Sequence, residues 1–271
     1  INMDDSNNDS LFGTNPFVKM GVALYIHIPF CKQACHYCDF HFSTSMKKKE
    51  EMVLAIANEL KLRKSEFENE IIETIYFGGG TPSVLELDEI NFLINTVYEN
   101  YSVSQTPEIT LEANPGTFEQ QKFADFHSAG VNRLSIGVQS FNHQHLQRLG
   151  RIHDGSQSLE AIAAASSAGF NNFNIDLMHG LPEQTTDQAN SDIELAINQG
   201  AQHISWYQLT IEPDTPFYKH QASGKLTLPD EDSAADMYEI TQSLCASAGL
   251  PAYEISNHGA DGHACRHNVA S

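Results

Sequence analysis

The chain has 271 residues, 41% of them hydrophobic, and a formal net charge of −20. This length suits one large α/β domain or two small ones, and no apolar run approaches the roughly 18 residues that span a membrane. The negative charge argues against non-specific binding to nucleic acids or to membrane surfaces.

The first 15 residues are rich in Asn, Asp and Ser and have neither the basic nor the apolar region of a signal peptide. We expect residues 1–19 to form a disordered lead-in and residues 20–271 to form the folded domain. Five cysteines, three of them clustered, are not typical of a secreted disulfide scaffold. We therefore expect a cytoplasmic protein.

Apolar residues along the chain alternate between the two-residue repeat of strands and the three- to four-residue repeat of helices. The expected strands are 22–28, 71–77, 108–113, 132–138, 170–178, 203–210 and 252–256. The expected helices are 47–67, 87–98, 118–128, 142–149, 156–168, 186–199 and 230–248, and 222–228 is expected to be a short hairpin or loop. This alternation predicts parallel strands joined by right-handed crossovers. The chain is short for an eightfold barrel, so we predict an open, partial (β/α)6 barrel.

Three cysteines follow the first expected strand in a C-x3-C-x2-C pattern, namely Cys31, Cys35 and Cys38. Thiolates are the soft ligands of iron–sulfur clusters, and three of them can hold three irons of a cubane and leave the fourth iron open. The same spacing also suits a zinc site with His36 or His41 as the fourth ligand.

A second motif, Gly78-Gly79-Gly80-Thr81-Pro82, follows the second expected strand. Glycines at the end of a strand let the backbone approach a ligand closely. The cysteine loop and this glycine loop, in this order, resemble the radical S-adenosylmethionine superfamily. The resemblance implies a 4Fe–4S cluster whose open iron binds the methionine group of S-adenosylmethionine, and a partial barrel of the radical S-adenosylmethionine type.

Five further sequence motifs are Tyr25–Cys31, Leu111–Pro115, Gly137–Phe141, Gly150–His153 and Asp176–Pro182. They narrow the resemblance to the oxygen-independent coproporphyrinogen III oxidase family and its HemW-type heme chaperone branch. The resemblance implies that Cys31, Cys35 and Cys38 ligate the cluster. The S-adenosylmethionine contacts that it implies are Tyr25, Tyr37, Gly79, Gly80, Thr81, Glu112, Gln139, Arg151, Asp176 and Thr210.

The sequence departs from the oxidase pattern after Asp39. The oxidases continue their motif as C-x3-C-x2-C-x-C, whereas this chain has Phe40 at the last cysteine position. We therefore expect a HemW-like protein that binds heme for delivery to acceptor proteins. A coproporphyrinogen III dehydrogenase acting on a porphyrinogen, and a non-catalytic zinc-binding domain, remain the alternatives, so no catalytic residue is assigned.

The end of the chain, His263 to Asn268, is similar to the approach to the HNxxYW motif of the HemW-type proteins. The sequence stops at Ser271, before the small helical C-terminal domain that the resemblance implies. Heme iron accepts axial histidine, so His267 is a candidate heme ligand.

Overall fold

The structure is a computed structural model that describes residues 21–116 and 120–270. The expected lead-in at residues 1–19 lies outside the described residues. The start of the helix expected over 118–128 also lies outside them.

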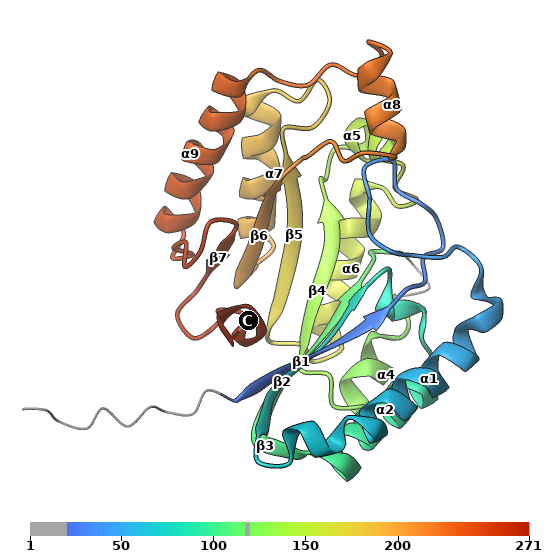
Figure 1. Ribbon diagram of the computed structural model, residues 1–271. Coiled ribbons are helices and arrows are strands. Elements are labelled where there is room, and N and C mark those ends of the chain that lie inside the picture. The colour runs from blue at the N-terminus through green and yellow to red at the C-terminus, as the bar shows by residue number, and fades with distance from the viewer. Residues whose placement is uncertain (1–20, 117–119, 271) are drawn as a thin grey trace, which may run out of the picture.

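One curved seven-stranded sheet forms the centre of the protein (Figure 1). Its strands follow one another in chain order, the first six are parallel, and the seventh runs antiparallel to the sixth. They are β1 (Val22–Ile28), β2 (Ile71–Gly79), β3 (Ser102–Ala113), β4 (Arg133–Gln139), β5 (Phe173–His179), β6 (His203–Gln208) and β7 (Asn257–Gly259). Because β1 and β7 are the two edges of this sheet, the barrel is open, which confirms the predicted partial barrel.

Helices surround the outside of the curved sheet, and the short C-terminal helix lies against its inner face (Figure 1). The helices are α1 (Lys49–Leu62), α2 (Leu87–Asn100), α4 (Phe123–Ser128), α5 (His143–Leu149), α6 (Gly155–Ser167), α7 (Thr186–Asn198), α8 (Pro216–Ala222), α9 (Glu231–Ser247) and α10 (Arg266–Ala270). Apolar residues of the outer helices join those of the strands in one buried cluster.

Alternation along each strand gives the sheet two chemically different faces. On β2, Ile75 and Phe77 are fully buried in the apolar cluster beneath the helices, whereas Thr74 and Tyr76 point to the other face. The same alternation on β3 to β6 places an unusual set of polar side chains on the inner face, namely Thr110, Glu112, Arg133, Ser135, Asn174, Asp176, His203 and Ser205. The inner face is therefore polar and the outer face apolar.

Several expected elements differ in the structure. The helix expected over 47–67 is α1, flanked by 3₁₀ turns at Met46–Lys48 and Lys64–Phe67. The short strand expected at 252–256 is wrong, because the chain pairs with β6 only at Asn257–Gly259. Residues 223–228 form a loop, and the helix α8 before them was not predicted, although Thr215 caps it and Pro216 begins it.

A buried carboxylate on β3 fixes the C-terminal helix to the sheet. Glu108 is 6% exposed, and its Oε1 accepts hydrogen bonds from the backbone N–H groups of Arg266 (2.9 Å) and His267 (3.3 Å). A negative charge at a helix N-terminus satisfies N–H groups that have no partner inside the helix. Arg266 adds an exposed ion pair with Glu73 at 2.8 Å.

We predict that Glu108→Ala releases α10 from the sheet. The substitution leaves two N–H groups without their acceptor, which costs about 1–3 kcal/mol, so amide hydrogen exchange over residues 266–270 should accelerate about tenfold or more. The matched control is Glu73→Ala, which removes only the exposed ion pair, worth under ~1 kcal/mol. Equal exchange rates in the two variants would contradict the role given to Glu108.

Candidate functional site

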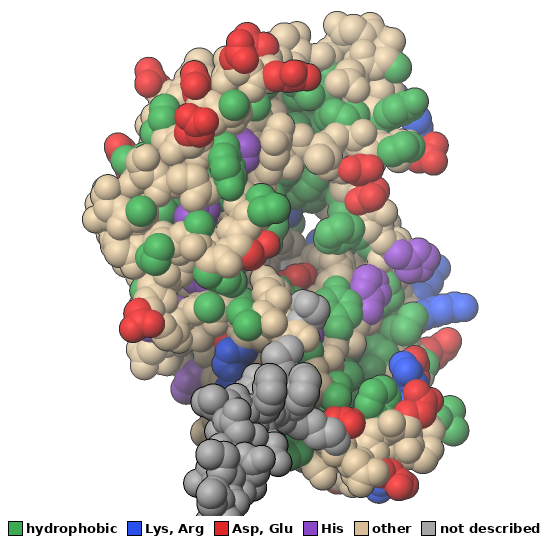
Figure 2. All heavy atoms as spheres, turned by 60° about the vertical axis from the view of Figure 1, so that its left-hand side comes forward, with side chains coloured by type: hydrophobic (Ala, Val, Ile, Leu, Met, Phe, Trp, Pro, Cys, Tyr) green, Lys and Arg blue, Asp and Glu red, His purple; other side chains and the backbone are tan. Residues whose placement is uncertain are grey.

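A cavity of about 590 Å³ opens at the carboxyl ends of the parallel strands. All three clustered cysteines line it together with nine of the predicted contact residues, namely Tyr37, Gly79, Gly80, Thr81, Glu112, Gln139, Arg151, Asp176 and Thr210. The space-filling view shows that the molecule is hollowed on this side, with hydrophobic and acidic side chains around the hollow (Figure 2). The fold thus brings twelve of the predicted residues, from distant parts of the chain, to one cavity.

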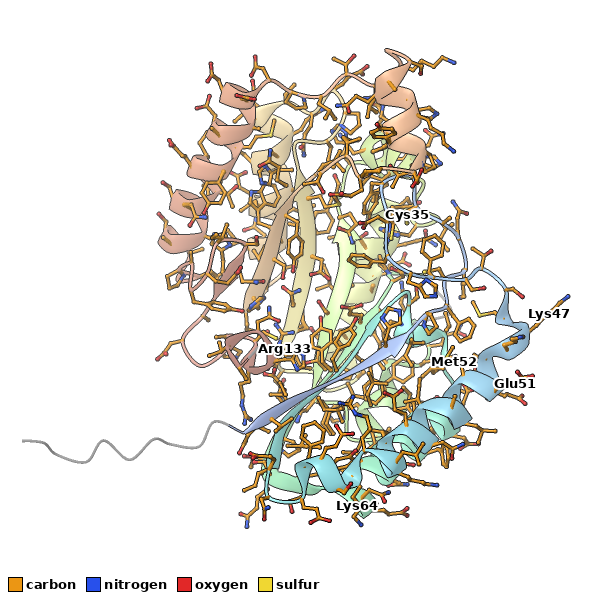
Figure 3. All side chains as sticks on the ribbon, in the orientation of Figure 1. Cys35, Lys47, Glu51, Met52, Lys64 and Arg133 are labelled. Atoms are coloured by element: carbon orange, nitrogen blue, oxygen red, sulfur yellow. The ribbon has the colours of Figure 1, made fainter. Side chains whose placement is uncertain are left out.

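The cysteine loop, residues 30–43, is held to the rest of the barrel by backbone hydrogen bonds. The N–H of His36 donates to the carbonyl of Leu149 at 2.9 Å, and the N–H of Phe217 on α8 donates to the carbonyl of His36 at 3.0 Å. Inside the loop, the N–H of Cys31 donates to the carbonyl of Ser43 at 3.0 Å. The His36 ring contacts the carbonyl of Arg148 through Nδ1 at 2.8 Å. These bonds tie the loop to the end of α5 and hold Cys35 above the strand ends (Figure 3).

The glycine loop passes so close to β1 and the cysteine loop that side chains are excluded. A Cβ on Gly80 would lie 2.7 Å from the Phe30 carbonyl oxygen and 3.0 Å from the Cys31 sulfur. Gly79 has a φ of +114°, a conformation that glycine adopts easily, and a Cβ there would lie 2.6 Å from the His27 ring. The glycines therefore allow the backbone of β2 to reach the sulfur of Cys31.

The donor set fits a cubane cluster better than a single metal ion. Across residues 21–116 and 120–270, no three Cys, His, Asp or Glu side chains converge on one point that could hold a metal ion. A zinc site needs such convergence, whereas a cubane is bound through a different iron by each cysteine. Burial raises the pKa of the Cys31 and Cys38 thiols, and because iron takes thiolates, cluster assembly would release protons.

Two partly buried carboxylates form the floor of the cavity. Glu112 accepts hydrogen bonds from the Tyr76 hydroxyl (3.0 Å) and the Gly79 N–H (3.2 Å), and burial followed by the nearby charge of Asp176 raises its pKa to about 8. Asp176 accepts from Ser135 (2.9 Å) and Asn174 (2.7 Å), and burial raises its pKa as well. Such a floor favours a cationic ligand, which would compensate the charge of both groups.

Gln139, the last residue of β4, reaches the cavity from a strained backbone conformation. Its φ of +67° lies in the left-handed region, which costs a non-glycine residue about 1–2 kcal/mol. Asp192 of α7 is 3% exposed and holds the turn in place, because it accepts hydrogen bonds from the Ser140 hydroxyl (2.6 Å) and the Phe141 N–H (2.8 Å). The contact spans 52 residues of sequence and was not predicted.

Two predicted residues lie next to the cavity without lining it. Tyr25 is 49% exposed and stacks on Tyr76, with ring centroids 5.8 Å apart. His267 is 8% exposed, its Nδ1 lies 2.9 Å from the Thr74 hydroxyl, and its ring contacts Tyr76 at 4.9 Å. Both therefore touch the cavity wall through Tyr76, and heme ligation by His267 stays a prediction.

Some cavity residues were missed by the sequence analysis. They include Tyr76, Asn114, Ser135, Met178 and Tyr207. Tyr76 lies two residues before Gly78 on the same strand face, so strand alternation was the signal that could have found it. The same reasoning applies to Asn114, which follows Glu112 by two residues.

A cavity at the carboxyl ends of parallel strands, lined by a three-cysteine loop and a glycine loop, is typical of iron–sulfur proteins with a partial barrel. A family model described as "Radical SAM superfamily" matches residues 25–196. The chain belongs to the radical SAM superfamily, whose members use a 4Fe–4S cluster and S-adenosylmethionine, and within it to the branch of HemN and HemW.

The chain is similar to several curated proteins named "Heme chaperone HemW". The relative from Escherichia coli is 43% identical over 92% of this chain, and that from Haemophilus influenzae is 41% identical over 92%. In both cases the chain spans only 65% of the relative's length. The relative from Mycobacterium tuberculosis is 32% identical over 95% of this chain and 67% of its own length.

Among solved structures, the chain is similar to coproporphyrinogen III oxidase (HemN) from Escherichia coli, described as a radical SAM enzyme. The two superpose with a TM-score of 0.79 at 25% identity, over 90% of this chain and 56% of the oxidase. The archaeal Elp3 from Methanocaldococcus infernus shares the fold with a TM-score of 0.57 at 14% identity.

We predict that Asp192→Ala destabilises the fold through the Gln139 turn. The change leaves the Ser140 hydroxyl and the Phe141 N–H buried without an acceptor, which lowers the free energy of unfolding in urea by about 2–4 kcal/mol. Asp187→Ala removes an exposed carboxylate from the first turn of the same helix and should cost under ~1 kcal/mol. A similar loss in both variants would show that the turn does not depend on Asp192.

A second prediction concerns the pH dependence that Glu112 confers on the cluster-free protein. Its pKa of about 8 lies above the ordinary 4.5, so the folded state binds the proton more tightly than the unfolded state does. Stability from this group is complete below about pH 4.5 and is lost as the pH rises to about 8. Glu112→Gln has no such proton. The melting temperature of this variant minus that of the wild type should therefore increase between about pH 4.5 and pH 8 and stay constant above pH 8.

The measurement is thermal unfolding of both proteins between pH 5 and pH 9. Glu160→Gln, on the exposed side of α6, serves as the control and should keep the wild-type pH dependence. A constant difference between wild type and Glu112→Gln at every pH would refute the assignment.

Proposed function

We propose that this protein holds a 4Fe–4S cluster on Cys31, Cys35 and Cys38, binds S-adenosylmethionine in the adjoining cavity, and binds heme for delivery to acceptor proteins. The observation that carries the proposal is the joint lining of one cavity by the three cysteines, the glycine loop and the two partly buried carboxylates. Sulfur ligands, a close backbone and anionic floor groups are what the cluster and a sulfonium cofactor require together.

Each part of the cavity has a separate task in binding S-adenosylmethionine. The N–H of Gly79 already donates to Glu112 and that of Gly80 to the Ile28 carbonyl, so these glycines would meet the methionine end of the cofactor through their carbonyl groups. Glu112 and Asp176 would face the cationic groups, and Arg151, Gln139 and Thr210 would complete the wall. The cluster supplies the electron that cleaves the sulfonium when this chemistry takes place, and the protein's residues orient the cofactor and exclude water.

Heme binding is supported by the names of the relatives and by the apolar part of the cavity wall. Phe40, Phe42, Met178 and Leu209 line the cavity, and Phe40 is 64% exposed. An exposed aromatic ring beside an opening suits a large flat ligand, because stacking against it removes apolar area from water. His267 is the proposed axial ligand among the described residues.

The relatives' names favour heme binding over oxidation of a porphyrinogen. The proteins that are 32–43% identical are named heme chaperones, whereas the oxidase HemN is 25% identical. Phe40 stands where the oxidase motif has its last cysteine, and its exposed ring at the cavity opening has no thiol chemistry to offer. A porphyrinogen dehydrogenase therefore ranks second, and a zinc-binding domain ranks third because its ligands do not converge.

The proposal also covers location. In the part of the chain that the structure describes, no helix is long and apolar enough to cross a lipid bilayer. All five cysteines are free thiols, which fits a reducing compartment, so we place the protein in the cytoplasm.

Anaerobic reconstitution followed by a heme titration tests the proposal. About four iron and four sulfide per chain are expected for a cubane, and S-adenosylmethionine should be cleaved to 5′-deoxyadenosine when the cluster is reduced. Heme should then give a saturable shift of its Soret band, weaker in His267→Ala. Full cluster content without any Soret shift would overturn the heme part alone.

We predict that Cys35→Ser abolishes the cluster and all cleavage of S-adenosylmethionine. A serine hydroxyl is a harder and far less acidic donor than a thiol, so it rarely replaces thiolate on iron. Cys245→Ser should retain both properties, because Cys245 is fully buried on α9 in the apolar cluster. Wild-type iron and sulfide content in Cys35→Ser would remove the central assignment.

A further inference from the structure

Three side chains that line the cavity form one hydrogen-bonded chain between two cysteine sulfurs. The Thr81 hydroxyl lies 3.6 Å from the sulfur of Cys31, and Arg151 Nη1 lies 3.6 Å from the sulfur of Cys35. Asn114 joins the two ends, because its Nδ2 donates to Thr81 Oγ1 (3.2 Å) and its Oδ1 accepts from Arg151 Nη2 (2.6 Å). The chain of contacts therefore runs from Cys31 through Thr81, Asn114 and Arg151 to Cys35.

The chemistry of arginine fixes the direction of every bond in this network. A guanidinium has only donors, so the oxygen of Asn114 must face Arg151 and its NH₂ group must face Thr81. The hydroxyl of Thr81 then accepts from Asn114, and its own proton is free to point at the sulfur of Cys31. Arg151 is anchored further by a bond of 2.7 Å to the Gly137 carbonyl.

We infer that Asn114 is a positioning residue that aims one donor at the sulfur of Cys31 and one at that of Cys35, and that this network sets the reduction potential of the cluster. The inference rests on the proposed cluster on Cys31, Cys35 and Cys38. Hydrogen bonds to ligand sulfurs stabilise the added negative charge of the reduced cluster and so raise its potential. Asn114 contacts neither sulfur, so its effect must pass through its neighbours.

The most informative variant is Asn114→Asp, which is nearly identical in shape. A carboxylate has no proton to donate, so Thr81 would turn its hydroxyl proton to Asp and away from Cys31, while Arg151 would be drawn toward the new charge. Both sulfurs then receive weaker hydrogen bonds, and the site gains a negative charge. The cluster of Asn114→Asp should therefore titrate at a lower potential than that of the wild type.

Thr81→Val and Thr81→Ser form a matched pair at one end of the network. Valine removes the donor to Cys31 at nearly constant volume, and its cluster should titrate below the wild type by a smaller shift than that of Asn114→Asp. Serine keeps the hydroxyl and should keep the wild-type potential. Because the residues act as one chain, the shift of the Thr81→Val/Asn114→Asp double variant should fall short of the sum of the single shifts.

The experiment is a redox titration of the reconstituted proteins, followed by the electron paramagnetic resonance signal of the reduced cluster, with iron and sulfide counted in each. Asn114→Asp can lose its cluster while the apo protein melts like the wild type, which would show that the network also holds the sulfurs in place. The reduction potential of the cluster in Thr81→Val then tests the inference. Full clusters in both variants with the wild-type potential would overturn the inference. A wild-type protein that holds no cluster would instead refute the proposed function, and this inference with it.

Discussion

The alternation of side chains along six parallel strands is the constraint on which the rest of the structure depends. Because successive residues point to opposite faces, each strand can supply apolar groups to the helices outside and polar groups to the interior. Ile75 and Phe77 do the first on β2, and Thr74 and Tyr76 do the second. A shift of one residue in any strand would exchange these faces, burying polar groups under the helices and filling the cavity with apolar ones.

A polar interior costs free energy unless its groups bond to one another, and on β5 and β6 the inner-face side chains form such a network. Asn174 donates to Asp176 and Ser135 and accepts from His203 (2.6 Å). Because His203 bonds through Nδ1 to an amide oxygen, its Nε2 accepts from the Tyr253 hydroxyl at 2.7 Å. Burial lowers the pKa of His203 to about 3, so the ring is neutral and the network carries no additional charge.

The sequence predicted best those features in which the residue type itself carries the chemistry. Glycines 79 and 80 could be assigned because only glycine fits there. The helix expected over 230–248 matches α9 closely, because Asp230 caps it by accepting from the Ser233 N–H at 2.8 Å. The bounds of β1 were predicted correctly, since its β-branched and aromatic run is bounded by turn-forming residues on both sides.

Features that arise only from contacts between distant segments could not be predicted. In the sequence, Asp192 is an ordinary helix residue, and only the fold brings it to Ser140. The short, polar sequence of α10 does not predict a helix, and its N-terminus depends on the distant Glu108. The strand expected at 252–256 failed for a related reason, because β7 is defined by its pairing with β6 and not by local propensity. Likewise, the position of Asn114 between Thr81 and Arg151 depends on the ends of β2, β3 and α5 meeting at one edge of the barrel.

Charge balance connects the cavity with the ligand that fits it. Among the residues that line the cavity, the acidic ones are Asp39, Glu112, Asp176 and Glu212, and the basic one is Arg151. Arg133, 1% exposed and deeper in the interior (Figure 3), partly opposes the rise that burial causes in the pKa of Asp176, and it does not line the cavity. S-Adenosylmethionine carries a sulfonium and an ammonium against one carboxylate, so its net positive charge offsets the carboxylates while Arg151 remains available to Cys35. A neutral or anionic cofactor would leave Glu112 to be neutralised by a proton instead, because burial and the nearby charge of Asp176 raise its pKa to about 8.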